Sequence, residues 1–172
     1  NNDVQNFTLG LYMLAQPGKT NTTTASNNVL GGIISYGAYI YNAGCTANLT
    51  SNNITCTGAS AWAVYVPYGT ANLNANSISS PYVGVAIRYS GASASLANNT
   101  ISNADYGVYA FGSGKLTSAY NNVITNNYYG LRFAADAAVM GNINNNDLSN
   151  NTVAISNGTA YQANANCNWY GT

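Results

Sequence analysis

Asparagines that stand two residues before an aliphatic residue recur along this chain at nearly even steps. The aliphatic members of successive pairs are 21 to 25 residues apart. A period in the low twenties indicates a solenoid, in which each repeat buries its apolar face only against its neighbours. The pairs are Asn27/Val29, Asn52/Ile54, Asn76/Ile78, Asn99/Ile101, Asn122/Ile124 and Asn146/Leu148, and Cys167/Trp169 continues the column with cysteine in place of asparagine.

Two more columns, mostly of apolar residues, repeat with the same period. Alternation of inward and outward residues within them predicts β-strands. Three short strands per repeat, joined by Gly, Asn and Ser corners, predict an all-β chain folded as a right-handed parallel β-helix of about seven coils, each of about 23 residues. The second column is Ala38, Val64, Val85, Val108, Leu131 and Val153, and the third is Leu49, Leu73, Leu96, Ala119, Ile143 and Asn164.

Residues 99–103 (NTISN) and 122–126 (NVITN) are each followed closely by Tyr-Gly and an aliphatic residue. These segments resemble the repeats of right-handed parallel β-helix proteins of the pectin-lyase-like superfamily, and the resemblance covers nearly the whole chain. The ending at residues 168–171, Asn-Trp-Tyr-Gly, is similar to the Asn-Trp-Trp-Gly that often closes such repeats in secreted bacterial and archaeal proteins. The resemblance implies a fold, whereas the function must be argued from individual residues.

Charged residues are scarce and balanced. Four basic and four acidic residues give a formal net charge of zero, and the chain has no histidine. Without clustered Lys and Arg we expect no binding to nucleic acid or anionic lipid, and without a long apolar run we expect no membrane insertion. The low charge and a start at Asn1, which suits a product whose signal peptide has been removed, predict an extracellular or cell-surface protein. We expect no cofactor and no metal site.

The positions of the three cysteines limit how they can pair. Cys45 and Cys56 flank the second coil, whereas Cys167 lies in the last one. About five coils of about 4.8 Å each separate Cys167 from the other two, which exceeds the roughly 7 Å Cα limit of a disulfide. A bridge within one chain can therefore only join Cys45 to Cys56. Cys167 is then either buried and free or linked to another chain.

Residues 1–25 are predicted to form a separate N-terminal segment, followed by a β-helix domain over residues 26–172. Alternation over residues 6–15 places four apolar side chains on one face, outside the register of the repeats. The segment is either a capping strand or a strand that pairs with a neighbouring subunit. The four side chains are Phe7, Leu9, Leu11 and Met13.

Aromatic residues occupy outward positions of the second strand in several repeats. They either stabilise the sheet by stacking on same-face neighbours or offer a surface to glycans or lateral protein contacts. One column has the aromatic members Tyr39, Tyr65 and Tyr109 and continues through Ala86, Arg132 and Ala154, and a second column holds Tyr36, Trp62, Val83, Tyr106 and Tyr129.

Sequons of the form Asn-x-Thr are more frequent than random placement predicts. They indicate N-glycosylation, although the repeat itself can generate such triplets. The sequon asparagines are Asn6, Asn21, Asn48, Asn53, Asn98, Asn150 and Asn157.

The superfamily resemblance also raises the possibility of an enzyme, because its members that cleave polysaccharides use carboxylates clustered on adjacent coils. No two carboxylates of this chain share a position in the repeat, and paired-carboxylate hydrolysis needs groups within about 5 to 10 Å of each other. With neither histidine nor glutamate, few other groups can carry acid-base catalysis. We therefore expect no catalytic site; the carboxylates are Asp3, Asp105, Asp136 and Asp147.

The sequence thus predicts a non-catalytic, secreted structural protein, a subunit of an extracellular filament, sheath or other cell-surface assembly. Copies of the chain stack end to end, and the coil that carries Cys167 and Trp169 meets the first coil of a neighbour. The alternative is a monomeric glycan-binding or adhesin module that uses Tyr39, Tyr65 and Tyr109. A polysaccharide lyase or hydrolase is less favoured.

Overall fold

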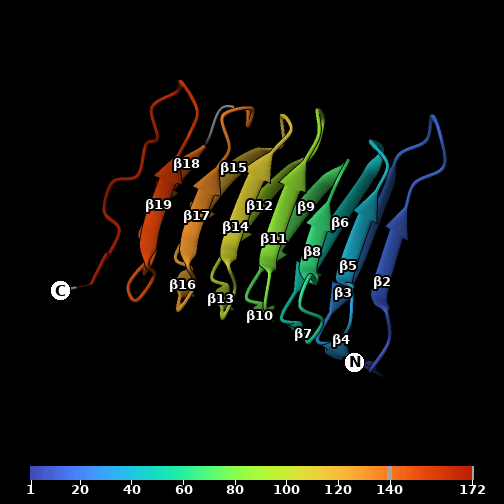
Figure 1. Cartoon of the computed structure of the whole chain (residues 1–172). Coiled ribbons are helices and arrows are strands. Elements are labelled where there is room, and N and C mark those ends of the chain that lie inside the picture. The colour runs from blue at the N-terminus through green and yellow to red at the C-terminus, as the bar shows by residue number, and fades with distance from the viewer. Residues whose placement is uncertain (139–140, 172) are drawn as a thin grey trace.

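The computed structural model describes residues 1–138 and 141–171 as a β-solenoid, with no helix in these ranges. The chain winds through three parallel sheets that run the length of the molecule (Figure 1). Sheet A contains β1 (Asp3–Gln5), β4 (Val29–Ile33), β7 (Asn53–Cys56), β10 (Ser77–Ser79), β13 (Thr100–Ser102) and β16 (Val123–Thr125). Sheet B contains β2 (Leu9–Leu14), β5 (Tyr36–Tyr41), β8 (Trp62–Val66), β11 (Val83–Arg88), β14 (Tyr106–Phe111), β17 (Tyr129–Phe133) and β19 (Val153–Asn157). Sheet C contains β3 (Asn21–Ser26), β6 (Cys45–Thr50), β9 (Thr70–Asn74), β12 (Ser93–Ala97), β15 (Lys115–Tyr120) and β18 (Asn142–Asn144).

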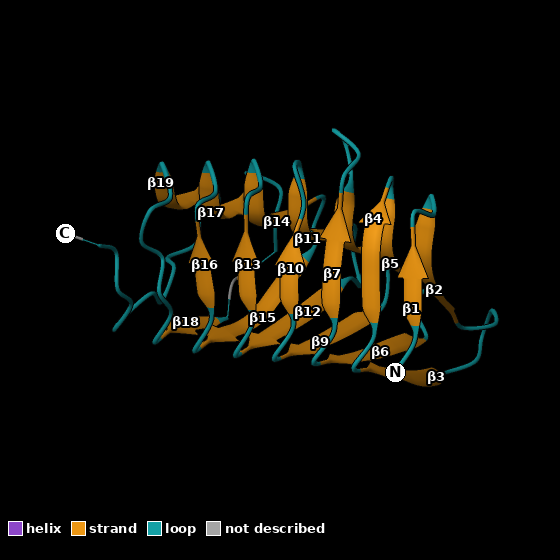
Figure 2. Ribbon diagram, turned by 90° about the horizontal axis from the view of Figure 1, so that it is seen from below, coloured by secondary structure: helices purple, strands orange, loops and turns teal. Residues whose placement is uncertain are grey.

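One strand from each sheet makes one coil. Within the described ranges, six coils carry all three strands, and β19 belongs to a partial seventh. In Figure 2 the strands of sheet A stand in a row in front of the other two sheets. The predicted all-β parallel β-helix with three strands per coil is confirmed, and the predicted number of coils is close to that observed.

The interior is filled by aliphatic side chains that stack in register from coil to coil. Leu30, Ile54, Ile78, Ile101 and Ile124 form one such column, and none of them is more than 1% exposed. Burying a side chain of this size contributes about 1.5–3 kcal/mol. The stack of these columns is therefore the main source of stability, and each coil depends on its neighbours to complete it.

The first asparagine pair lies one residue further along the chain than predicted. Leu30, not Val29, aligns with Ile54, and Asn28, not Asn27, is buried. The backbone of Asn27 has a φ of 57°, a left-handed conformation that asparagine tolerates well. Because two consecutive asparagines each precede an aliphatic residue, the spacing alone did not select the inward one.

The last coil is also shifted relative to the prediction. Ile155, not Val153, aligns with Leu131, because two aliphatic residues two positions apart fit the same alternation. Asn164 donates from its Nδ2 to Asn142 Oδ1 on the outer surface, and Ala165 packs against the core in its place.

Residues 1–25 do not form a segment separate from the repeats. β1, β2 and β3 pair in parallel with β4, β5 and β6, so they make the first coil. Leu11 aligns with Ala38 and Met13 with Ile40, and both face the core. Phe7 is 59% exposed and Leu9 is 36% exposed, so the four predicted residues do not share one face. The prediction failed because the inward positions of β2 begin only at Leu11, whereas Leu9 aligns with the outward Tyr36.

Candidate functional site

A column of asparagine side chains runs through the corner between sheets C and A along the whole solenoid, and we call it the asparagine ladder. Each amide Oδ1 accepts hydrogen bonds from the main-chain N–H and the side-chain Nδ2 of the preceding asparagine, at 2.9–3.0 Å. The ladder consists of Asn2, Asn28, Asn52, Asn76, Asn99, Asn122, Asn146 and Asn168.

The ladder satisfies its own polar groups. Asn76 Nδ2, for example, donates both to Asn99 Oδ1 and to the main-chain oxygen of Leu49. The ladder side chains from Asn28 to Asn146 are at most 6% exposed. Buried polar groups that pair in this way stabilise a fold and offer nothing to a ligand. The asparagine column is therefore a hydrogen-bonded stack from coil to coil, with Asn28 in place of Asn27.

The tolerance of asparagine for left-handed backbone is used by a different set of residues from the ladder. The residue just before each ladder asparagine, from Asn27 to Cys167, has a positive φ. Cys167 belongs to this outer set, with a φ of 59°, and it is exposed. The prediction that Cys167 replaces an asparagine in the inward column is wrong, because Asn168 accepts the bonds from Asn146.

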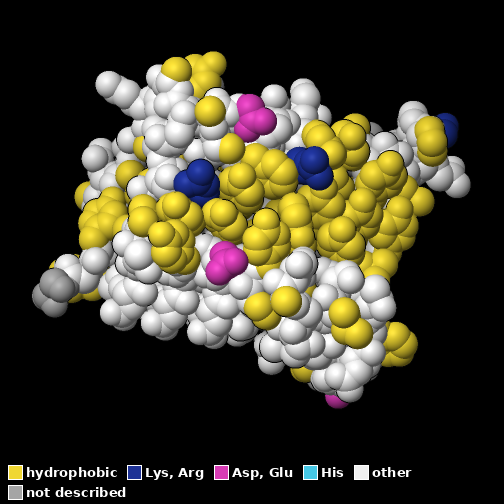
Figure 3. All heavy atoms as spheres, in the orientation of Figure 1, with side chains coloured by type: hydrophobic (Ala, Val, Ile, Leu, Met, Phe, Trp, Pro, Cys, Tyr) yellow, Lys and Arg dark blue, Asp and Glu magenta, His cyan; other side chains and the backbone are white. Residues whose placement is uncertain are grey.

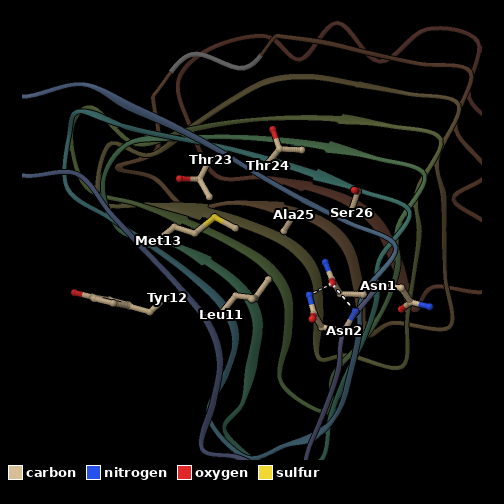
Figure 4. Close-up of a pocket in the computed structure, with 10 residues that line it drawn as sticks. Asn1, Asn2, Leu11, Tyr12, Met13, Thr23, Thr24, Ala25 and Ser26 are labelled. Carbon is tan, nitrogen blue, oxygen red and sulfur yellow. Dashed lines mark hydrogen bonds between the residues drawn. The ribbon is translucent and has the colours of Figure 1, made fainter.

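The ladder has a direction, because each asparagine donates toward the last coil and accepts from the side of the first. Among the described residues, Asn2 Oδ1 receives no hydrogen bond, and the main-chain N–H of Asn168 donates none. Beside Asn2, the first coil encloses a hollow of about 370 Å³ lined by Leu11, Met13 and Ala25 (Figure 4). The first coil therefore presents a free amide acceptor and the last coil a free main-chain donor, whereas the Asn168 Nδ2 donates to Ile143 and Ala165 oxygens.

Outside sheet B, aromatic side chains form a continuous surface over strands β2 to β17 (Figure 3). Tyr65, Val83 and Ala86 point away from the core, yet each is at most 6% exposed because the surrounding rings cover them. We call this surface the aromatic face. Its rings are those of Tyr12, Tyr36, Tyr39, Trp62, Tyr65, Tyr82, Tyr106, Tyr109, Phe111 and Tyr129.

The predicted aromatic surface of Tyr39, Tyr65 and Tyr109 is thus present, but its rings stack on one another. The Tyr39 and Tyr65 ring centroids are 5.2 Å apart. The Tyr109 ring lies between those of Tyr106 and Phe111, at 4.7 Å and 4.5 Å, with interplanar angles of 16° and 17°. Ring faces covered in this way leave mainly edges and hydroxyl groups for other molecules.

Both arginines of the chain are embedded in the aromatic face. Arg88 lies over the Tyr89 and Phe111 rings at 4.3 and 5.2 Å and donates from Nη1 to Tyr65 Oη at 3.4 Å. This hydrogen bond raises the pKa of Arg88. Arg132 lies over the Tyr129 ring at 4.7 Å.

Three tyrosines of the face, Tyr39, Tyr65 and Tyr106, have raised pKa values and resist ionisation. Burial, followed by the neighbouring tyrosines Tyr65 and Tyr36, raises the pKa of Tyr39 to about 12. Burial is also the largest cause of the raised pKa values of Tyr65 and Tyr106. These three tyrosines are therefore neutral at ordinary pH.

A model of the right-handed β-helix region matches residues 3–169. The chain belongs to the right-handed β-helix family. Comparisons with curated proteins and with solved structures gave no match. This family contains both enzymes and non-enzymes, so membership alone does not decide whether this β-helix is catalytic. The match begins inside the first coil, in agreement with the pairing of β1 with β4.

The carboxylates of this β-helix belong to separate strands and corners. Asp3 is in β1, Asp105 precedes β14 and Asp136 follows β17. Asp147 bridges Val123 and Trp169, and its Oδ1 accepts from the Ser149 N–H. Among the described residues, no group of three or more His, Cys, Asp or Glu is placed to hold a metal ion. No helix in these ranges is long and apolar enough to cross a membrane.

The predicted Cys45–Cys56 disulfide is not formed. Cys45 and Cys56 are both buried and free, on β6 of sheet C and β7 of sheet A. Burial raises the pKa of Cys56 to about 11 and also raises that of Cys45, so neither thiol is reactive. Cys167 is exposed rather than buried, because it occupies an outward corner position. The position of the cysteines in the repeat correctly predicted that Cys167 lies apart from the other two. It did not predict correctly that Cys45 and Cys56 form a disulfide.

The sequon asparagines lie mostly on the surface. Only Asn48 is half-buried, and its Oδ1 accepts from Asn72 Nδ2. Asn157 forms a turn in which its Oδ1 accepts from both the N–H and the hydroxyl of Thr159. The remaining sequon asparagines, all exposed, are Asn6, Asn21, Asn53, Asn98 and Asn150.

Two features of the site were not found in the sequence. Asn2 and Val4 form the first asparagine–aliphatic pair, since Asn2 bonds to Asn28 and Val4 aligns with Leu30. Extending the column one step toward the start would have located them. The second feature is the burial of Tyr65 beneath neighbouring rings, which no periodic pattern in the sequence indicates.

Proposed function

We propose that this β-helix is a non-catalytic structural protein of an extracellular or cell-surface assembly, in which copies stack end to end. The observation that carries this proposal is the direction of the asparagine ladder. A copy stacked in the same orientation would bring its Asn168 N–H to Asn2 Oδ1 of the next copy. It would thereby repeat the main-chain bond by which the Asn146 N–H donates to Asn168 Oδ1 within one chain.

The edges of the first coil support the same arrangement. Among the strands that the structure describes, β1, β2 and β3 each stand at the end of their sheets and pair on one side only. Unpaired strand edges readily accept another strand. The partly buried side chains of Leu11 and Ala25 would be covered by a stacked coil. A net charge of zero adds no general repulsion between copies.

The residues predicted at the contact now have unequal support. Leu11 and Met13 line the hollow at the first coil. Trp169 is 56% exposed at the last coil, next to the exposed Cys167, so both are free to meet a neighbour. Phe7 and Leu9 lie on the outer surface and have no part in the proposed contact.

Electron microscopy and light scattering of the purified protein over a range of concentrations test the stacking. We expect rods longer than one chain, which Leu11→Lys shortens to single chains because a charge would enter the junction. Asn2→Leu, which removes the acceptor, is a second variant. Thr100→Lys adds the same charge on the exposed outside of sheet A and should leave the rods intact. Rods that survive both end variants, with thermal unfolding showing that the variants are folded, would overturn the proposal.

A second candidate function is a monomeric glycan-binding or adhesin module. One observation favours it: a trough of about 530 Å³ on sheet C, lined by amides and hydroxyls together with Leu73, Leu96 and Ala97. Tyr120 at its edge is 44% exposed and offers a free ring. The trough also includes Asn72, Asn74, Ser95, Asn98 and Ser118. Some of these polar groups bond to one another, Ser95 to Asn72 and Asn98 to Asn74. The ring of Tyr120 is open, whereas neighbouring rings cover those of Tyr39 and Tyr109.

Binding of a stable monomer to immobilised glycans would favour this second candidate. Tyr120→Ala should then reduce the binding, whereas Tyr41→Ala, which truncates an exposed tyrosine of sheet B, should not. A monomer that binds no glycan leaves this candidate without support.

A further inference from the structure

The aromatic face has the composition of a protein–protein contact. The cores of such interfaces are enriched in Tyr, Trp, Phe and Arg, and they are poor in Lys, Asp and Ser. On this molecule the two arginines, Trp62 and most of the stacked tyrosines gather on one side of sheet B. Trp, Tyr and Arg are also the side chains that most often dominate binding energy.

The stacking of the rings argues against a glycan as the occupant of this face. Sugars pack on open ring faces, and the faces of Tyr39, Tyr106 and Tyr109 are covered by neighbouring rings. What remains exposed is a broad apolar surface of ring edges. A surface of this kind fits another flat, apolar protein surface.

The charges at the borders of the face are complementary to one another. Arg88 ends β11, and Arg132 is the next-to-last residue of β17. Asp105 stands just before β14, the strand between these two in sheet B. The strands are parallel, so Asp105 lies at the opposite border from the arginines, one coil from each of them along the solenoid axis. Asp136, which follows β17, lies at the border of the arginines.

We propose that two copies of this chain pair through their aromatic faces, related by a two-fold axis parallel to the solenoid axis. This rotation keeps each coil opposite the same coil of the second copy and reverses the strand direction across the contact. It therefore sets the Asp105 border of one copy against the arginine border of the other. Asp105 of each copy then lies between Arg88 and Arg132 of its partner.

The arginines are prepared for such a contact. The rings of Tyr89, Phe111 and Tyr129 already hold both guanidinium groups, so less side-chain freedom is lost on binding. The two copies point the same way along the axis, which also keeps their asparagine ladders parallel. The pairing does not depend on end-to-end stacking, and either can fail without the other.

Sedimentation and light scattering over a range of concentrations test the pairing with the full chain. Wild-type protein is expected to form dimers. Asp105→Arg alone, and Arg88→Asp together with Arg132→Asp, place like charges opposite each other in both contacts of the dimer. Each should weaken dimerisation roughly 30-fold or more, because a charge pair covered by an interface is lost. Thr100→Arg adds a positive charge on β13 of sheet A, away from both the aromatic face and the ends of the solenoid, and should have no effect.

Mixing the two charge-changed proteins is the decisive experiment. In a mixed pair, both contacts again join opposite charges, so we expect a heterodimer to form from two proteins that are each monomeric. The mixture also shows that the variants are folded. A wild-type protein that stays monomeric, a dimer that Asp105→Arg leaves unchanged, or a mixture that forms no heterodimer would each overturn the proposal. Loss of assembly with Leu11→Lys alone would indicate end-to-end stacking instead.

Discussion

Two stacks run from coil to coil along this molecule, one of amides in the interior and one of aromatic rings outside. In the asparagine ladder every described coil repeats the same residue and the same bonds. In the aromatic face the column passes from Tyr65 through Ala86 to Tyr109 and then to Arg132. The interior stack accepts one residue type because its groups have no access to water, whereas the outer stack accepts gaps because rings rearrange around them. The invariant column specifies the fold, and the variable one is free to serve a partner.

Removing one amide from the ladder should give the largest loss of stability. Asn99→Leu removes the acceptor of the Asn76 main-chain N–H and of one of the two N–H groups of its Nδ2, and each unpaired buried group costs about 1–3 kcal/mol. We expect the free energy of unfolding to fall by about 4 kcal/mol, measured by urea denaturation. Asn98→Gly is the matched control. Asn98 is exposed with a φ of 58°, which glycine accepts, so the change should stay within about 0.5 kcal/mol. Equal losses of stability for the two variants would contradict the assignment of hydrogen bonding to Asn99 and of the left-handed corner position to Asn98.

Truncating a ring of the aromatic face should cost less than breaking the ladder. Tyr65→Ala removes a ring that is 6% exposed and its contacts with Trp62 and Tyr39, but the arginine that it releases can reach water. We expect a loss of about 2 kcal/mol in urea denaturation. Tyr12→Ala, at a position that is 51% exposed, should cost about 0.5 kcal/mol or less. If Tyr65→Ala lost more stability than Asn99→Leu, the aromatic face would contribute more to the fold than the ladder, which would contradict the comparison.

Alkaline pH should weaken the aromatic face and leave the ladder unaffected. The pKa of Tyr39 is raised to about 12 in the folded protein, against about 10 in the unfolded chain. The folded state therefore keeps a proton that the unfolded state loses, so stability is fully present below about pH 10 and declines as the pH rises toward 12. Denaturation curves in this window, with tyrosinate absorbance as the titration signal, measure the effect. Tyr39→Phe should show a smaller decline. A decline of equal size in that variant would assign the effect to other groups.

The smallest effect on stability is expected at Cys167. In the folded protein a thiol reagent should modify Cys167 alone, because Cys45 and Cys56 are buried. Denaturation should then expose all three thiols. Cys167→Ser should change the free energy of unfolding by about 0.5 kcal/mol or less and abolish the rapid reaction. A folded protein with no reactive thiol, or an unfolded one with a single thiol, would contradict this assignment.

The aliphatic columns of the middle coils were predictable because burial repeats there at a constant step. Spacing alone was enough to predict the alignment of Ile54, Ile78, Ile101 and Ile124. Register failed at both ends, where period-two alternation or consecutive asparagines allow two choices. Asn27 and Asn28 illustrate the difficulty, because one residue decides which amide faces the core.

Contacts between residues that do not share a column were not predictable. The periodicity places Cys45 and Cys56 on consecutive strands, yet it carries no information on the distance between strands of different sheets. The cover over Tyr65 likewise depends on Tyr36, Tyr39 and Trp62 leaning together, which is a matter of side-chain conformation. The sequence therefore identified the aromatic column and left its accessibility open.

Each asparagine of the ladder donates and accepts the same hydrogen bonds as the others, and this has a consequence for how the length of such a chain can change. A whole coil can be inserted or removed without leaving an amide of the ladder unpaired. The asparagines on either side of the change can form the same hydrogen bonds with their new neighbours. A shorter insertion within the asparagine corner would instead turn the inward residue out and its neighbour in. We therefore expect length variation among related chains to occur in steps of one coil, with the irregular remainder confined to loops such as residues 158–164.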